Sequence, residues 1–206
     1  MNVLSRILKH KIVAIIRGAD PADVLQIALA LKQGGVDILE VTLNSSNALP
    51  VIGQLVKKFD DEMLIGAGTV LDSKTAKAVI ELGAKFIVSP NVDVDTIHAT
   101  KANGAVSIPG AFTATEIVNA YSNGGDIIKI FPASSAEYIK VLRGPLSHVP
   151  MMPTGGITLE NISEFKKAGA AAFGIGTSLI DTKKKITEEY LKQVTENASK
   201  FVEAIS

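Results

Sequence analysis

The chain has 206 residues, of which 47% are hydrophobic and 20% charged, a composition ordinary for a globular protein. Its 21 basic residues balance 21 acidic ones, so it lacks the basic excess of nucleic-acid-binding proteins, and we expect no nucleic-acid partner. Because there is no cysteine, disulfides, zinc–thiolate sites and thiol catalysis are excluded, and a reducing compartment is favoured.

The chain begins with segment 1–9, which predicts a leading helix, and continues with the apolar run 12–16, which stops at Arg17. This run is shorter than the roughly 7–15 apolar residues of a secretion signal. No apolar run approaches the roughly 20 residues that span a bilayer. We therefore read 12–17 as a first strand and expect a cytoplasmic protein without membrane contact.

Short apolar runs rich in Val and Ile then alternate with longer segments of helical spacing. Continuous apolar runs are typical of parallel strands that are covered on both faces. The eight runs are 12–17, 37–43, 63–70, 86–90, 105–110, 127–132, 151–156 and 172–177.

The segments between the runs carry helix start signals. Ser73 is a predicted N-cap, and Thr113 and Glu116 have the spacing of a capping box. The last segment, 186–205, has one apolar face. We expect the basic run Lys183–Lys185 to be its solvated beginning.

Alternating strands and helices form either an open doubly wound sheet or a closed barrel. Eight repeats favour the (β/α)8 barrel, in a compact form, because that fold typically takes about 250 residues. No G-x-G-x-x-G follows the first strand, which argues against a dinucleotide-binding sheet. We predict one (β/α)8-barrel domain, residues 1–206, with an extra N-terminal helix.

Active sites of such barrels lie at the carboxyl ends of the strands, where Lys129 stands among isoleucines. Burial lowers the pKa of a lysine, and a neutral amine can attack a ketone to form a Schiff base. A strand lysine that reaches the rim or pairs with a carboxylate for stability is the structural alternative.

Two further charged residues lie on the first two predicted strands. Glu40 is a carboxylate within an apolar run, suited to proton transfer or to a buried ion pair. Arg17 ends the first strand, and its planar guanidinium suits a carboxylate or phosphate, or a pair with Glu40 or Asp20.

Glycine pairs follow strands seven and eight, where these barrels often bind phosphate through backbone N–H groups. They are Gly155-Gly156 and the stretch from Gly174 to Ser178. Tight turns also need glycine, so each pair alone is weak. The three histidines form no pattern with metal-ligand spacing, and we expect no catalytic metal.

With these strand ends in order, the sequence resembles the 2-keto-3-deoxy-6-phosphogluconate (KDPG) and 4-hydroxy-2-oxoglutarate (KHG) aldolase family. The resemblance covers nearly the whole chain, from about Ile12 to Asp181. The matching stretches are IVAIIRG, GGVDILEVTL, LIGAGTVL, GAKFIVSPN, IPGAFTATE, IIKIFPA, GP at 144–145, PTGGIT and GIGTSL.

The resemblance implies a cofactor-free and metal-free class I lyase of Entner–Doudoroff-type carbohydrate metabolism, usually a homotrimer. It implies cleavage of KDPG to pyruvate and glyceraldehyde 3-phosphate, with possible cleavage of KHG to pyruvate and glyoxylate. Lys129 matches the Schiff-base lysine, and Glu40 matches the general acid–base. Thr69, Pro90 and Phe131 match residues around pyruvate, and the phosphate-binding backbone matches Gly155, Gly156, Gly176 and Thr177.

The sequence departs from the family in one place. Many members hold the substrate carboxylate with an arginine after the second strand, where this chain has Asn44. Because strands one and two are neighbours, we predict that Arg17 binds that carboxylate instead. The IIRG motif also resembles the aldolase for the galactonate epimer (KDPGal), whereas Thr154 in PTGG resembles the gluconate type. We predict the gluconate epimer and keep the galactonate epimer as an alternative.

Two other classes stay open. A phosphosugar isomerase or epimerase on the same barrel would use Glu40 as a base without a covalent intermediate. A non-catalytic phosphate-binding barrel is disfavoured, because three charged residues on apolar strands destabilise the fold without a ligand.

Overall fold

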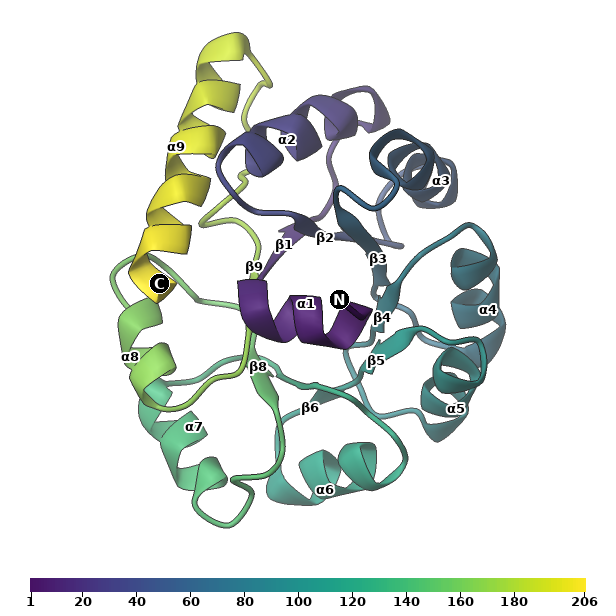
Figure 1. Ribbon diagram of the computed structural model, residues 1–206, viewed down its shortest axis with the longest axis vertical. Coiled ribbons are helices and arrows are strands. Elements are labelled where there is room, and N and C mark those ends of the chain that lie inside the picture. The colour runs from purple at the N-terminus through teal and green to yellow at the C-terminus, as the bar shows by residue number, and fades with distance from the viewer.

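A computed structural model describes all residues 1–206 as an α/β fold in which the strands curl around a common centre and most helices lie outside them (Figure 1). The strands are β1 (Ile12–Ile16), β2 (Ile38–Thr42), β3 (Leu64–Gly68), β4 (Phe86–Val88), β5 (Val106–Ile108), β6 (Gly110–Ala111), β7 (Ile128–Ile130), β8 (Met151–Pro153) and β9 (Phe173–Ile175). The helices are α1 (Val3–His10), α2 (Pro21–Gln33), α3 (Ala48–Phe59), α4 (Ser73–Glu81), α5 (Val94–Ala102), α6 (Ala114–Ser122), α7 (Ala136–Arg143), α8 (Ile162–Lys167) and α9 (Glu188–Ile205).

The strands form two sheets in which every pair is parallel. One sheet has the order β5-β4-β3-β2-β1-β9 and curls into a half-barrel, and the other has the order β6-β7-β8. Each predicted run contains a strand, so the parallel α/β fold is confirmed. The fifth run is split into β5 and β6 at Pro109, which has no backbone N–H to donate.

Backbone contacts link the two sheets on both sides. Ala171 N–H donates to the Met151 carbonyl at 2.8 Å, and Thr154 forms an isolated parallel β-bridge with Gly174. On the other side, Lys129 N–H donates to the Pro109 carbonyl at 2.9 Å, between β5 and β6. These bonds bring the carboxyl ends of β7 and β8 close to those of β1 and β9.

The predicted leading helix is confirmed as α1, which lies across the centre of the strands in Figure 1. Its Ile7 is fully buried in an apolar cluster with Val13, Ile38 and Phe86 of three strands. Burial of one such side chain stabilises a fold by about 1.5–3 kcal/mol. Arg6 adds an ion pair with Asp37 at the start of β2. The helix therefore covers one end of the strand assembly.

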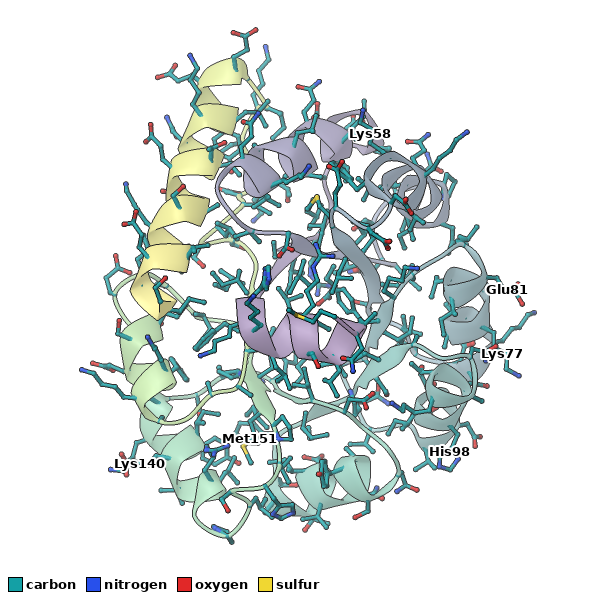
Figure 2. The ribbon with its side chains drawn as sticks, viewed as in Figure 1. Lys58, Lys77, Glu81, His98, Lys140 and Met151 are labelled. Atoms are coloured by element: carbon teal, nitrogen blue, oxygen red, sulfur yellow. The ribbon has the colours of Figure 1, made fainter.

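The outer helices pack one face on the strands and turn their charged residues away. Figure 2 shows Lys58, Lys77, Glu81 and Lys140 pointing outward from this layer. A larger cluster of buried apolar residues fills the space between helices and strands. None of the helices has both the length and the apolar character that crossing a bilayer requires.

The starts of helices α6 and α4 test two of the sequence predictions. The capping box of Thr113 and Glu116 is present at α6. Ser73 is not the N-cap of α4, because the Asp72 carboxylate accepts the Thr75 N–H at 2.7 Å.

The run Lys183–Lys185 does not begin the last helix, as we had expected from the sequence. Helix α9 begins at Glu188 behind the N-cap Thr187. Acidic residues suit the positive end of a helix dipole, whereas three lysines would be repelled by it. The lysines therefore lie in the loop between β9 and α9.

Candidate functional site

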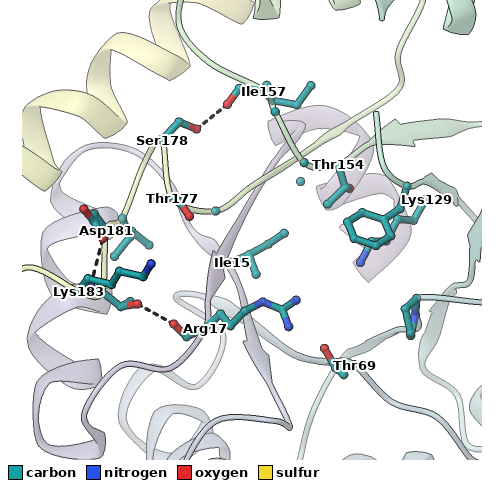
Figure 3. A pocket seen from close by; sticks show the side chains of 18 residues that line it. Ile15, Arg17, Thr69, Lys129, Thr154, Ile157, Thr177, Ser178, Asp181 and Lys183 are labelled. Carbon is teal, nitrogen blue, oxygen red and sulfur yellow. Dashed lines mark hydrogen bonds between the residues drawn. The ribbon is translucent and has the colours of Figure 1, made fainter. Parts of the chain in front are cut away.

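A pocket of about 640 Å³ lies at the carboxyl ends of the strands, where these folds place their active sites (Figure 3). Ten residues predicted from the sequence line it together. They are Arg17, Thr69, Pro90, Lys129, Phe131, Thr154, Gly155, Gly156, Gly176 and Thr177.

Lys129 is the cation most enclosed by the protein. It lies in β7 between the buried Ile128 and Ile130, is 4% exposed, and lines the pocket. Its Nζ is 4.7 Å from the centre of the Phe131 ring. Burial lowers the pKa of Lys129, the nearby Glu40 charge opposes that shift, and Arg17 adds to it. The neutral, nucleophilic form of the amine is thus favoured more in this site than it is for a lysine in water.

Glu40 does not line the pocket but lies on the side of β2 that faces it. Its register partner in β1 is Ile15, which does line the pocket. The Glu40 side chain is fully buried, and neither carboxylate oxygen has a hydrogen-bond partner. Burial raises the pKa of Glu40, while Lys129 and Arg17 both oppose the rise. An unpartnered carboxylate at such depth is costly, and a reacting group or water in the pocket could relieve that cost.

Gly68 makes the room that the Glu40 carboxylate occupies. Residue 66 of β3 is the register partner of Glu40, and Gly68 is two residues further along on the same face. A Cβ added at Gly68 would overlap the Glu40 carboxylate. The glycine in the LIGAG strand is therefore a packing requirement of the buried acid.

Arg17 is positioned by the end of the neighbouring strand. Its Nη1 donates to Asn44 Oδ1 at 3.1 Å, and the next residue, Gly18, donates its N–H to Ser45 Oγ at 2.8 Å. No hydrogen bond or ion pair joins Arg17 to Glu40 or Asp20, so neither alternative pairing predicted from the sequence forms. In Figure 3 the guanidinium extends into the pocket.

Thr69, Pro90 and Phe131 contribute to the wall near Lys129. Thr69 has a φ of 57°, which is rare for a β-branched residue and must be held by its surroundings. Phe131 is 39% exposed and presents its ring to the pocket. Phe131 thus places an aromatic surface beside the Lys129 amine.

The glycine-rich turns after β8 and β9 form another part of the pocket. Gly155 and Gly156 have φ values of 85° and 75°, which favour glycine. Gly176 and Thr177 follow β9, and the next residue, Ser178, donates its hydroxyl to the Ile157 carbonyl. The last hydrogen bond joins the two turns, so their backbones can contact one ligand.

Sequence reasoning missed part of the lining. Apart from Ile15 and Ile157, the missed residues lie in the loop that follows the predicted β9 turn: Ile180, Asp181, Thr182 and Lys183. Thr182 Oγ1 donates to the Arg17 carbonyl at 2.7 Å, which ties this loop to the end of β1. The only sequence signal for this part of the pocket was the run of three lysines, 183–185, which we had assigned to the beginning of the last helix.

No group of three or more His, Asp or Glu side chains lies close enough together to hold a metal ion. His10 interacts with Asp37 at 2.8 Å, and His148 lies edge-on to Tyr121.

Comparison with known proteins agrees with this geometry. The model of the KDPG and KHG aldolase family matches residues 3–197. The chain is 34% identical to the 2-dehydro-3-deoxy-6-phosphogalactonate aldolase of Escherichia coli, over 95% of both chains. It is 35% identical to the 2-dehydro-3-deoxy-phosphogluconate aldolase of Pseudomonas aeruginosa, over 70% of this chain and 66% of that protein.

A solved structure is also similar. It is a KDPG aldolase from Legionella pneumophila with pyruvate captured as a covalent carbinolamine intermediate. The TM-score is 0.79 at 28% identity, over 98% of this chain and 96% of the other. Together with the family match, these findings identify the chain as an aldolase that belongs to the KDPG and KHG aldolase family.

Proposed function

We propose that the protein is a class I aldolase that cleaves KDPG to pyruvate and glyceraldehyde 3-phosphate through a Schiff base on Lys129. The observation that carries the proposal is the buried Lys129 amine, whose pKa is lowered by desolvation, at a pocket beside the buried Glu40. The pyruvate carbinolamine captured in the Legionella relative supports covalent chemistry of this kind.

The reaction begins when the neutral Lys129 amine attacks the C2 ketone and forms a carbinolamine. Glu40 donates a proton to the departing hydroxyl, and loss of water gives an iminium ion. The raised pKa of Glu40 suits this step, because burial favours the protonated carboxyl that donates.

Carbon–carbon cleavage then uses the iminium as the electron sink. Glu40, now a carboxylate, accepts the proton of the C4 hydroxyl through a water. The C3–C4 bond breaks, its electrons form an enamine on Lys129, and glyceraldehyde 3-phosphate leaves. Protonation of the enamine at C3 and hydrolysis of the imine release pyruvate and restore the amine.

The remaining residues would hold the two ends of the substrate. Arg17 would bind the C1 carboxylate, while Thr69, Pro90 and Phe131 enclose the pyruvate part. Backbone N–H groups of Gly155, Gly156, Gly176 and Thr177 would bind the phosphate.

The substrate epimer is a separate question. The galactonate enzyme of Escherichia coli resembles this chain over 95% of its length, which favours KDPGal. Thr154 favours the gluconate epimer, because the PTGG motif resembles the gluconate type and this residue lines the pocket. We place KDPG first, KDPGal second, and cleavage of KHG as a side activity.

The wider proposal is a closed (β/α)8 barrel of one domain, residues 1–206, that forms a homotrimer in the cytoplasm. The hydrogen bonds that link the two sheets on both sides support closure. The trimer is carried over from the family, and light scattering with the purified protein tests it.

A coupled assay for pyruvate release tests the activity. KDPG, KDPGal and KHG are each supplied to the wild type and to Lys129→Met, with lactate dehydrogenase and NADH reporting pyruvate. The proposal predicts release from KDPG at the highest kcat/KM and none with Lys129→Met. Release from none of the three would leave an isomerase or epimerase on the same site as the better assignment.

A further inference from the structure

Lys183 is a third basic side chain at the pocket, beside Arg17 and Lys129, and the proposed mechanism leaves it unused. It is exposed and lines the pocket in the loop between β9 and α9. In Figure 3, Lys129 and Lys183 lie on opposite sides of the pocket, with Arg17 and Ile15 between them. The Lys183 amine points inward, on the side where Thr177 and Ser178 lie.

The loop that carries Lys183 is held on both of its sides. Tyr190 of α9 accepts the Asp181 N–H at 2.7 Å and donates its hydroxyl to the Asp181 carbonyl at 3.0 Å. Thr182 Oγ1 donates to the Arg17 carbonyl, and Lys183 N–H donates to Asp181 Oδ1 at 3.1 Å. The backbone that carries Lys183 is thus held by Arg17 at the end of β1 and by Tyr190 of α9.

The charges near this end of the pocket need such a cation. The glycine turns offer N–H dipoles but no full charge, and a phosphate monoester carries about −1.5 to −2 at neutral pH. The Asp181 carboxylate also lines the pocket and would repel that anion. Arg17 donates a hydrogen bond to Asn44, and in Figure 3 its guanidinium points toward Thr69, away from Lys183. Lys183 is therefore the side chain placed to balance the phosphate.

We propose that Lys183 binds the terminal phosphate of the substrate and makes the enzyme prefer phosphorylated over unphosphorylated 2-keto acids. This inference rests on the proposed function, because it assumes that the keto end lies at Lys129. Lysine acts as a flexible point charge, so it can approach the phosphate while backbone N–H groups fix its orientation.

Kinetics of Lys183→Gln test the assignment, with Lys185→Gln as the matched control, since Lys185 is an exposed lysine of the same loop outside the pocket lining. We expect Lys183→Gln to raise the KM for KDPG about fivefold, near the upper end for an exposed ion pair. The KM for KHG, which has no phosphate, should stay unchanged. The rise in KM for KDPG should be smaller at high salt, because salt screens exposed charges. Lys183→Arg keeps the positive charge and should keep a KM near the wild-type value.

Equal effects on KDPG and KHG, or no effect on either, would overturn the assignment. Calorimetric binding of glycerol 3-phosphate provides a readout that needs no catalysis. The Kd should rise in Lys183→Gln and stay at the wild-type value in Lys185→Gln. Equal Kd values for the wild type and Lys183→Gln would overturn the proposal even if the protein cleaved neither substrate. Lack of a borohydride-trapped pyruvate adduct in the wild type would instead remove the aldolase mechanism.

Discussion

The Arg17 guanidinium donates a hydrogen bond of 3.1 Å to the side-chain oxygen of Asn44, across the ends of two neighbouring strands. Asn44 stands where many family members carry the arginine that holds the substrate carboxylate. A guanidinium from β1 thus reaches the end of β2. This relationship supports the prediction that Arg17 replaces the missing arginine.

Arg17→Ala should raise the KM for both KDPG and KHG by roughly 10- to 100-fold, because a charge-assisted hydrogen bond to the C1 carboxylate is lost. Initial-rate kinetics measure the effect. Asn44→Ala is the matched comparison and should change KM less, since it leaves the cation in place. If Arg17→Ala left the Michaelis constants unchanged, another residue would have to hold the carboxylate.

Glu40→Gln should lower kcat by roughly 10²- to 10⁴-fold, because the amide keeps the shape of the carboxyl but cannot transfer protons. Single-turnover cleavage of KDPG measures the chemical step, and a melting curve checks that the variant is folded. An unchanged kcat in a folded variant would assign proton transfer to another group.

The charges around Lys129 should shift the pH dependence of imine formation in opposite directions. Only the neutral amine attacks pyruvate, so the trapping rate rises with pH through the pKa of Lys129. Glu40 raises that pKa, so Glu40→Gln should move the midpoint to lower pH. Arg17 lowers it, so Arg17→Gln should move the midpoint to higher pH.

The rate of borohydride trapping with pyruvate, measured across pH, gives these midpoints independently of the maximal rate. Lys185→Gln serves as the control for loss of a distant charge. Shifts of the same sign in the two variants would contradict the proposed electrostatics of the site.

Gly68→Ala should destabilise the fold by about 1–3 kcal/mol and lower kcat, because the new methyl group overlaps the Glu40 carboxylate. Gly53→Ala, in helix α3 with nothing near its missing Cβ, should stabilise by about 0.5–1 kcal/mol. Urea unfolding measures both free energies. Equal effects of the two substitutions would show that Gly68 does not make room for Glu40.

The strands and the centre of the site could be predicted from the sequence because their signals are local. Buried parallel strands are continuous apolar runs, and a lysine or glutamate within such a run is conspicuous. Since the carboxyl ends of the strands meet, Lys129, Arg17 and the glycine turns fall around one pocket. The family resemblance supplied the roles that the pattern alone left undecided.

The loop before α9 could not be predicted, because its course depends on distant partners. Thr182 is held by the carbonyl of Arg17, 165 residues away, and Asp181 by Tyr190. Within the sequence, Lys183 is one of three adjacent lysines with nothing to distinguish it. The space that Gly68 leaves for Glu40 is likewise visible only when β2 and β3 pair.

Trapping of a pyruvate adduct tests the central claim most directly. The wild type is incubated with pyruvate, reduced with borohydride, digested, and mapped by mass spectrometry. Our account predicts one stable adduct, on Lys129, and no adduct at that peptide in Lys129→Met. Lack of any adduct in the wild type, or an adduct on another lysine alone, would contradict it.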